Sequence, residues 1–169
     1  GLVGSEMCIR DRAKELQYHT KMINSGRYVN DSMGRYIGKK VVKKIISQGK
    51  NILGAHVLVM GMTFKENVSD IRNSKVADII NEFKDFGAEV DVMDPFASPL
   101  EVLQEYGIRL VERPGKKYDA VVVAVAHTTY LKLDESYFMS ITNEHAVLAD
   151  VKGVYRGSCL LYTSPSPRD

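Results

Sequence analysis

Two basic residues, Lys65 and Arg72, follow a short apolar run and a glycine, and this arrangement is typical of phosphate binding. Residues 57–60 read VLVM, and Gly61 comes next. An unbroken apolar run predicts a strand buried on both faces of a parallel sheet, and the glycine lets the chain turn at its end. Ligands of open α/β sheets sit beyond the carboxyl ends of strands, where a following helix offers free N–H groups to an anion. We therefore expect Lys65 and Arg72 to lie at a nucleotide site.

The loop after this strand lacks the dinucleotide-binding fingerprint. It reads GMTFK, whereas a G-x-G-x-x-G loop would let a pyrophosphate lie against the backbone. This difference disfavours an independent NAD- or flavin-binding domain. A receiver-like signalling domain is disfavoured too, because Gly61 and Met62 stand where that fold carries an acidic pair. The sequence predicts a nucleotide site of another kind.

Three further polar residues follow predicted strands. Lys152 comes just after residues 146–149, on the same expected ligand edge, although an ordinary surface lysine would look the same. Asp94 ends residues 90–93, where a dinucleotide-binding fold places its ribose-binding acid, but Asp-Pro also terminates strands and we favour that interpretation. His127 has no acid or nucleophile close to it in the sequence. We expect it to be a hydrogen-bonding residue at the sheet edge rather than a general base.

Two residues of the loop have plain structural alternatives. Phe64 has an aromatic ring that either contacts the ligand or belongs to the core. A local ion pair between Arg72 and Asp70 or Glu66 would explain Arg72 as well as a ligand does. The sequence leaves both alternatives open.

One long amphipathic helix is predicted ahead of the first strand, over residues 30–48. Asn30 or Asp31 is expected to cap its start, and Gly49 to end it. Arg27 and Asn30 could reach a substrate, although capping explains Asn30 without one. Apolar residues recur at helical spacing on one face, at Met33, Tyr36, Ile37, Val41, Val42 and Ile45. The opposite face is expected to be a solvated one, with Lys39, Lys40, Lys43 and Lys44.

The rest of the chain alternates strands with helices. The strands are predicted at residues 57–60, 90–93, 108–111, 120–126 and 146–149. The helices are predicted between Ser74 and Gly87, between Ser98 and Gly107, and at residues 134–141. This alternation predicts an α/β fold with a Rossmann-like parallel sheet and flanking helices.

The two ends of the chain look foreign to it. Residues 2–12 and 159–169 can be back-translated as sequencing-library transposon adapters, so we expect residues 1–12 and 158–169 to be non-native tails. Cys8 and Cys159 lie in these tails, so the remaining residues offer neither a disulfide nor a thiolate nucleophile. The formal net charge of +2 argues against a nucleic-acid partner. No apolar run has membrane-spanning length, and 44% of residues are hydrophobic, as expected of a soluble globular protein without a membrane partner.

Four segments in order carry a resemblance to a known family. They read GMTFKENVSDIRNSK, VDVMDP, VVVAVAH and ADVKGVYR. This order is similar to the C-terminal part of the UDP-glucose/GDP-mannose dehydrogenase family. The upstream GRYVNDSMG resembles members that oxidise UDP-N-acetylhexosamines for surface polysaccharides. The resemblance implies a central dimerisation helix within residues 13–52 and a UDP-binding domain at residues 53–157.

The resemblance also implies a function. The family members are cytoplasmic NAD-dependent 6-dehydrogenases that oxidise the sugar C6 alcohol to a carboxylate through a cysteine thiohemiacetal. By this resemblance Phe64 and Lys65 contact the UDP-sugar, Lys152 helps to hold the nucleotide, and the long helix forms a homodimer. The reactive cysteine precedes the segment matching Ala13, and NAD binds a separate N-terminal domain. We therefore expect a binding module that lacks the catalytic residues, with a stand-alone Rossmann-like nucleotide-binding module as the alternative.

Overall fold

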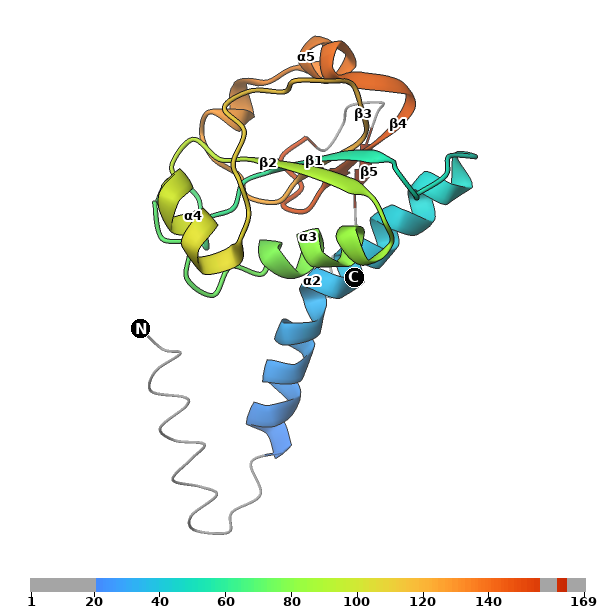
Figure 1. Cartoon of the computed structure of the whole chain (residues 1–169). Coiled ribbons are helices and arrows are strands. Elements are labelled where there is room, and N and C mark those ends of the chain that lie inside the picture. Colours follow the sequence, from blue (N-terminus) through green and yellow to red (C-terminus); the bar gives the residue numbers. More distant parts are fainter. Residues whose placement is uncertain (1–20, 156–160, 164–169) are drawn as a thin grey trace, which may run out of the picture. The chain divides into compact units, whose positions relative to one another are not determined.

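The computed structural model describes residues 21–155 and 161–163, which fall into two compact units. The first unit, residues 1–33, contributes the start of helix α2 (Lys21–Ser47), and the second begins at Gly34 (Figure 1). The chain is already helical from Lys21, so Asn30 and Asp31 lie inside the helix and the prediction that they cap it is wrong. Gly49 follows the helix end with φ of +77°, as predicted. No helix in the described stretches is long and apolar enough to cross a bilayer.

The second unit contains one parallel sheet with the strand order β2-β1-β3-β4-β5. Every neighbouring pair is parallel, which confirms the Rossmann-like α/β fold. The strands are β1 (His56–Met60), β2 (Glu89–Met93), β3 (Tyr118–Val123), β4 (Thr142–Asp150) and β5 (Leu161–Thr163).

Two predicted strands are missing or shortened in the structure, and β4 starts four residues before its predicted position. Residues 108–111 form no strand, and only an isolated bridge joins Leu110 to Val92 of β2. The central strand ends at Val123 instead of residue 126, because the backbone N–H groups of Ala124 and Val125 both donate to the carbonyl of Met60. The chain therefore bends over the end of β1 where the prediction continued straight.

The helices match their predicted positions. They are α3 (Val76–Asp85), α4 (Pro99–Tyr106) and α5 (Glu135–Ile141), with a 3-10 turn at Tyr130–Lys132. Ser98 caps α4 through its side chain, and Gly107 ends it in the left-handed conformation. Ser74 lies one residue before the cap position of α3, where its hydroxyl accepts the Val76 N–H at 3.3 Å.

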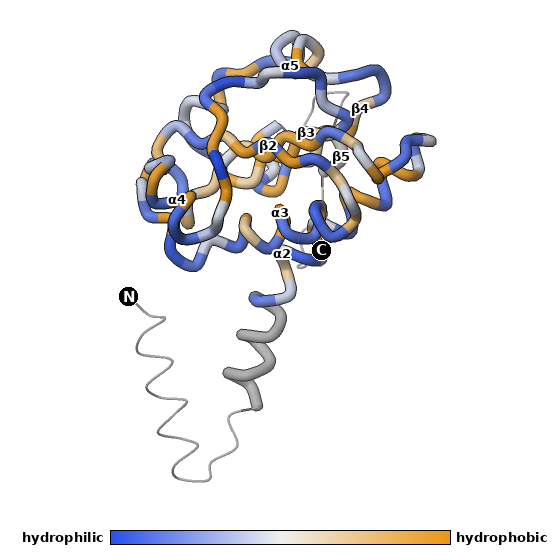
Figure 2. The backbone as a smooth tube through the Cα atoms, in the orientation of Figure 1, coloured by the Kyte–Doolittle hydropathy of each residue, from blue (hydrophilic) through white to orange (hydrophobic). Residues whose placement is uncertain are grey.

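The core lies on both faces of the sheet. In Figure 1, α3 lies on one side of the sheet and α5 on the other, and Figure 2 shows the hydrophobic colour concentrated along the central strands. On the α5 side, Phe138 and Ile141 join a buried cluster with Leu58 and Met60 of β1. Because β1 and β3 are buried on both faces, their carboxyl ends are held firmly in place.

The part of α2 that belongs to the second unit packs closely on α3. A Cβ on Gly34 would lie 2.7 Å from the Asp78 Cβ, and one on Gly38 would lie 2.8 Å from the Glu82 Cβ. The neighbouring apolar residues are buried in the chain itself, namely Ile37, Val41, Val42 and Ile45. The domain therefore uses these four residues of the predicted stripe in its own core, whereas Tyr36 of the same stripe is 45% exposed.

Part of the C-terminal tail takes a place in the sheet. Leu161–Thr163 forms β5 and pairs in parallel with β4, with Leu161 opposite Leu148. The other tail residues lie outside the described residues. The pairing of β5 does not test where the tail sequences come from, so their adapter-like origin stays a prediction.

Candidate functional site

The loop after β1 is shaped first by Gly61. Gly61 has φ of +97°, and its N–H donates to the carbonyl of Met93 at the end of β2. A side chain at this position would meet Val125 of the neighbouring loop. Glycine allows the turn that the sequence predicted, and it is also required for the close approach of the two backbones, which the sequence did not reveal.

Asp94 anchors the same loop from the end of β2. Its Oδ2 accepts the N–H groups of Met62 at 2.6 Å and Thr63 at 3.1 Å, while its Oδ1 accepts those of Phe96 at 2.7 Å and Ala97 at 3.0 Å. Its side chain is completely buried. Burial opposes ionisation, but the hydrogen bonds from His127 and the backbone outweigh it and hold the pKa of Asp94 well below its usual range. Asp94 ends the strand as predicted, and it also organises the loop, which the sequence did not reveal.

His127 connects Asp94 to the far side of the loop. Its Nε2 lies 3.0 Å from Asp94 Oδ2 and 3.2 Å from Thr63 Oγ1, and its Nδ1 accepts the Asn67 N–H at 3.0 Å. The ring is fully buried and packs against Phe96, with 4.8 Å between ring centroids. The prediction of a hydrogen-bonding residue is confirmed, and the acid that it contacts, Asp94, comes from a distant part of the sequence.

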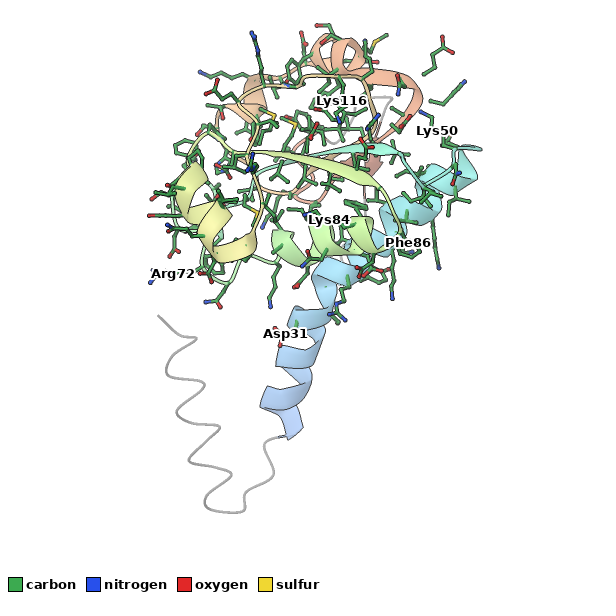
Figure 3. The ribbon with its side chains drawn as sticks, viewed as in Figure 1. Asp31, Lys50, Arg72, Lys84, Phe86 and Lys116 are labelled. Atoms are coloured by element: carbon green, nitrogen blue, oxygen red, sulfur yellow. The ribbon has the colours of Figure 1, made fainter. Side chains whose placement is uncertain are left out.

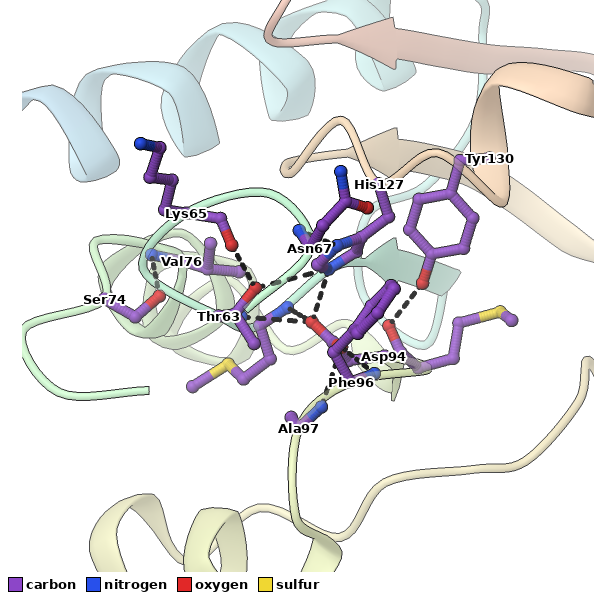
Figure 4. A network of polar contacts seen from close by, with 12 residues as sticks. Thr63, Lys65, Asn67, Ser74, Val76, Asp94, Phe96, Ala97, His127 and Tyr130 are labelled. Atoms are coloured by element: carbon purple, nitrogen blue, oxygen red, sulfur yellow. Dashed lines mark hydrogen bonds and ion pairs between the residues drawn. The ribbon is translucent and has the colours of Figure 1, made fainter. Parts of the chain in front are cut away.

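Thr63, Asn67, Asp94 and His127 form one connected set, which we call the strand-end network (Figure 4). It joins the ends of β1, β2 and β3. Parallel strands place their carboxyl ends at one edge of the sheet, so polar residues that follow different strands can meet there. That rule was the one sequence signal from which the network could have been found.

Lys65 and Phe64 lie on the outside of this loop. The Lys65 carbonyl accepts the Thr63 hydroxyl at 2.9 Å, while its side chain is exposed and points away from the network in Figure 4. Phe64 is 59% exposed, so it does not belong to the core, which removes the structural alternative for its ring. An exposed ammonium beside a fixed backbone is available to a solute anion.

Arg72 has a local partner. Its Nε and one terminal nitrogen donate to the two carboxylate oxygens of Asp70 at 3.0 and 2.9 Å, as one of the two sequence interpretations expected. The hydrogen bonds from Arg72 lower the pKa of Asp70 to about 2. The Arg72 side chain points outward at the surface (Figure 3) and lines a hollow of about 430 Å³ next to α4. Asp70, Glu101 and Glu105 also line this hollow, and their carboxylates disfavour a diphosphate there.

Lys152 lies on a second anchored loop, at the end of β4. Asp150 is buried, and its carboxylate accepts the N–H groups of Lys152, Gly153 and Tyr155 at 2.8–3.1 Å. The Lys152 side chain is exposed. Sequence reasoning selected the lysine and missed the aspartate that shapes its loop.

The structure places Lys65 and Lys152 on the same edge of the sheet. Lys65 follows β1 and Lys152 follows β4, with β3 between them. Two strand spacings amount to about 10 Å, a span that two flexible lysine side chains can bridge. Arg27 and Asn30 lie in α2, and their side chains are outside the described part of the chain, so the structure does not connect them to this edge.

Comparison with known proteins identifies similar sequences and structures. The sequence model described as the UDP-glucose/GDP-mannose dehydrogenase family, UDP binding domain, matches residues 58–157. The UDP-N-acetyl-D-glucosamine 6-dehydrogenases of Pseudomonas aeruginosa and Salmonella typhi are 38% and 36% identical over 90% and 91% of this chain. This chain spans 38% of the length of each of them. A UDP-glucose dehydrogenase structure from Pyrobaculum islandicum matches with a TM-score of 0.67 at 25% identity, over 86% of this chain and 32% of that one.

Proposed function

Because this chain belongs to the UDP-glucose/GDP-mannose dehydrogenase family and carries its UDP-binding domain, we propose that it supplies the UDP-sugar-binding part of a nucleotide-sugar 6-dehydrogenase. The proposed substrate is a UDP-N-acetylhexosamine, which the enzyme oxidises at C6 for polysaccharide synthesis. The 36–38% identity to UDP-N-acetyl-D-glucosamine 6-dehydrogenases supports this choice.

The observation that carries the proposal is the exposed Lys65 on a loop with a fixed backbone. Lys65 and Lys152 follow two strands of one parallel sheet, at the edge where such folds bind ligands. Two ammonium groups at this edge favour a diphosphate over an uncharged ligand. Phe64 contacts the base or sugar in this proposal, and Arg72, which already pairs with Asp70, has a secondary role.

The rest of the enzyme enters the proposal through the resemblance. NAD and the reactive cysteine belong to the part of the relatives that this chain does not span, so we expect the isolated chain to form no NADH with a UDP-N-acetylhexosamine and NAD. A cytoplasmic location rests on the resemblance alone. Self-association through residues 30–48 also rests on it, because Ile37, Val41, Val42 and Ile45 are buried inside the chain. Sedimentation of the whole chain at high concentration tests it, and a monomer would end that part of the proposal.

Calorimetry with UDP, uridine and NAD tests the binding function. We expect UDP to bind ahead of uridine and NAD, with an affinity that falls as salt rises. Lys65→Glu should lose most of the preference for UDP, because the reversed charge repels the diphosphate.

Lys84→Glu provides the matched control. Lys84 is an exposed lysine in the last turn of α3, which precedes the opposite end of the strands, and reversing its charge should leave the preference unchanged. Equal preference for UDP in Lys65→Glu would remove Lys65 from the site. Tighter binding of NAD than of UDP would overturn the proposed function.

A further inference from the structure

The strand-end network holds the backbone of the loop on both sides of Lys65. The Asp94 carboxylate accepts the N–H of Thr63, and the Thr63 hydroxyl donates to the carbonyl of Lys65. His127 accepts the N–H of Asn67. Backbone atoms before, at and after Lys65 are therefore all fixed, while its ammonium group remains exposed. We propose that Asp94, His127 and Thr63 are positioning residues that set the loop in the shape needed for Lys65 to meet a diphosphate. This inference rests on the proposed function.

The contacts define which ring nitrogen of His127 carries the proton. Nδ1 accepts the Asn67 N–H and so carries no hydrogen. Nε2 then carries it and faces both Asp94 Oδ2 and Thr63 Oγ1. The single hydroxyl hydrogen of Thr63 is used on the Lys65 carbonyl, so Thr63 Oγ1 accepts from the ring. Asp94 Oδ2 and Thr63 Oγ1 share the one Nε2 hydrogen, and the tautomer with its hydrogen on Nε2 is the one that fits these contacts.

The carboxylate of Asp94 is what maintains this arrangement. Its two oxygens accept five hydrogen bonds, from four backbone N–H groups and His127. In Asp94→Asn, an NH₂ group replaces one of the two oxygens and faces hydrogen-bond donors that the oxygen accepted. If that group faces His127, the ring must accept at Nε2 and carry its hydrogen on Nδ1, where it meets the Asn67 N–H. A change of one oxygen in Asp94 thereby alters the loop on the far side of Lys65.

Asn67 completes the fixed loop. It has φ of +59°, a conformation that few residues other than glycine adopt. Its Oδ1 accepts both the N–H of Thr128 at 2.9 Å and the hydroxyl of Thr128 at 2.6 Å. These contacts fasten the loop after β1 to the loop after β3, so that the end of the Lys65 segment cannot move independently of His127.

Burial keeps water from competing with these contacts. The Asp94 and His127 side chains have no exposed area. Phe96 and Tyr130 pack against the imidazole, with ring centroids 4.8 and 5.4 Å away. Hydrogen bonds in such a site hold their geometry better than exposed ones do. Because the backbone around Lys65 is already ordered, binding a ligand costs little further conformational entropy there, which favours affinity.

The test compares Thr63→Val with Thr63→Ser and Asp94→Asn in the whole chain. Valine matches threonine in shape and lacks the hydroxyl, whereas serine keeps it. We expect Thr63→Val and Asp94→Asn to lose about tenfold of the UDP affinity, which is about 1.4 kcal/mol, with uridine binding unchanged. Thr63→Ser should bind UDP as the unmodified chain does, because it keeps the hydroxyl. If Thr63→Val lost affinity through packing alone, the smaller serine would not restore it. The Asp119→Asn control removes a similarly hydrogen-bonded carboxylate at the opposite ends of the strands and should leave the ratio of UDP to uridine affinity unchanged.

Nuclear magnetic resonance of the unliganded protein provides a readout independent of UDP. The His127 nitrogen shifts should show an unprotonated Nδ1, and the amides of residues 62–67 should be as ordered as those of β1. In Asp94→Asn both signatures should be lost. The positioning role would be overturned if Thr63→Val and Asp94→Asn fold and keep the full preference for UDP. A loop that is mobile in the unmodified chain would overturn it as well. If the unmodified chain shows no preference for UDP, the proposed function fails, while the magnetic resonance result still decides whether the network orders the loop.

Discussion

Gly61 and Val125 touch so closely that a Cβ on Gly61 would lie 2.5 Å from the Cβ of Val125. The backbone nitrogen of Val125 would lie only 2.9 Å from the same added atom. This contact joins the end of β1 to the chain that leaves β3, two residues before Thr63 on one side and two residues before His127 on the other. Any side chain at residue 61 would push the two loops apart.

Gly61→Ala is therefore expected to destabilise the protein by about 2–4 kcal/mol, through the close contact and the positive φ together. Urea unfolding measures the change. Gly115→Ala is the control, because a Cβ there meets no atom within 4 Å, and it should change the free energy of unfolding by less than about 0.5 kcal/mol. Equal stability of the two variants would mean that the loops separate without cost.

Gly34→Ala should lower the melting temperature, although alanine is the better helix former. In an exposed helix this substitution stabilises by about 1 kcal/mol. At Gly34 the added Cβ would lie 2.7 Å from the Lys75 carbonyl oxygen and from the Asp78 Cβ, so α2 must move away from α3. A rise in the melting temperature would show that the two helices accommodate the methyl group.

Ile45→Ala should cost about 2–5 kcal/mol, because Ile45 is fully buried. The neighbouring Ile46 is 53% exposed, so Ile46→Ala should change stability by less than about 0.5 kcal/mol. Chemical unfolding at several protein concentrations measures both variants. A concentration-dependent loss in Ile45→Ala would instead indicate that this stripe lies between two copies of the chain.

Removal of residues 1–12 and 158–169 should leave the free energy of unfolding unchanged within about 0.5 kcal/mol, as expected of tails that contribute little to the core. The second deletion removes β5, which pairs with β4 over Leu161–Thr163. Deleting each tail separately tells the two contributions apart. A clear loss of stability on removing residues 158–169 alone would make β5 an integral strand of the fold.

Stability should fall in acid partly through Asp94. A carboxyl group whose pKa is lowered by folding contributes stability that is fully present above its unfolded pKa, about 3.9, and is lost as the pH falls toward the folded value. The pKa of Asp94 is lowered in this way. Asp94→Asn should thus be less stable than the unmodified chain at pH 7 and should lose less between about pH 4 and pH 2. If the free energy of unfolding falls by the same amount in both proteins over this pH range, the role given to Asp94 is contradicted.

The sequence predicted the elements that depend on local patterns. The helix caps at Ser98 and Gly107, the apolar runs of β1 and β3, and the alternation of strands and helices all follow from neighbouring residues. It failed at residues 108–111, where the segment IRLV was predicted to be a strand but forms only one bridge, to Val92. Strand formation depends on a partner, and a four-residue pattern does not reveal whether a partner extends alongside it.

The candidate site shows the same division. Lys65 and Lys152 were found because each follows an apolar run, whereas the partnership of Asp94 and His127 joins residues that are 33 positions apart. The pairing depends on which strands are neighbours, and sequence alone does not supply the strand order. Ile37 and Val41 show the same limit, since an apolar stripe indicates burial without identifying the partner.

The strand-end network engages backbone atoms on both sides of Lys65 and makes no use of the side chains at Phe64, Lys65 or Glu66. Loop shape and ligand chemistry are therefore encoded by different residues. Mutations at the three exposed positions can alter which anion or sugar is preferred without dismantling the scaffold, so this edge of the sheet is well suited to evolutionary diversification and to engineered changes of specificity.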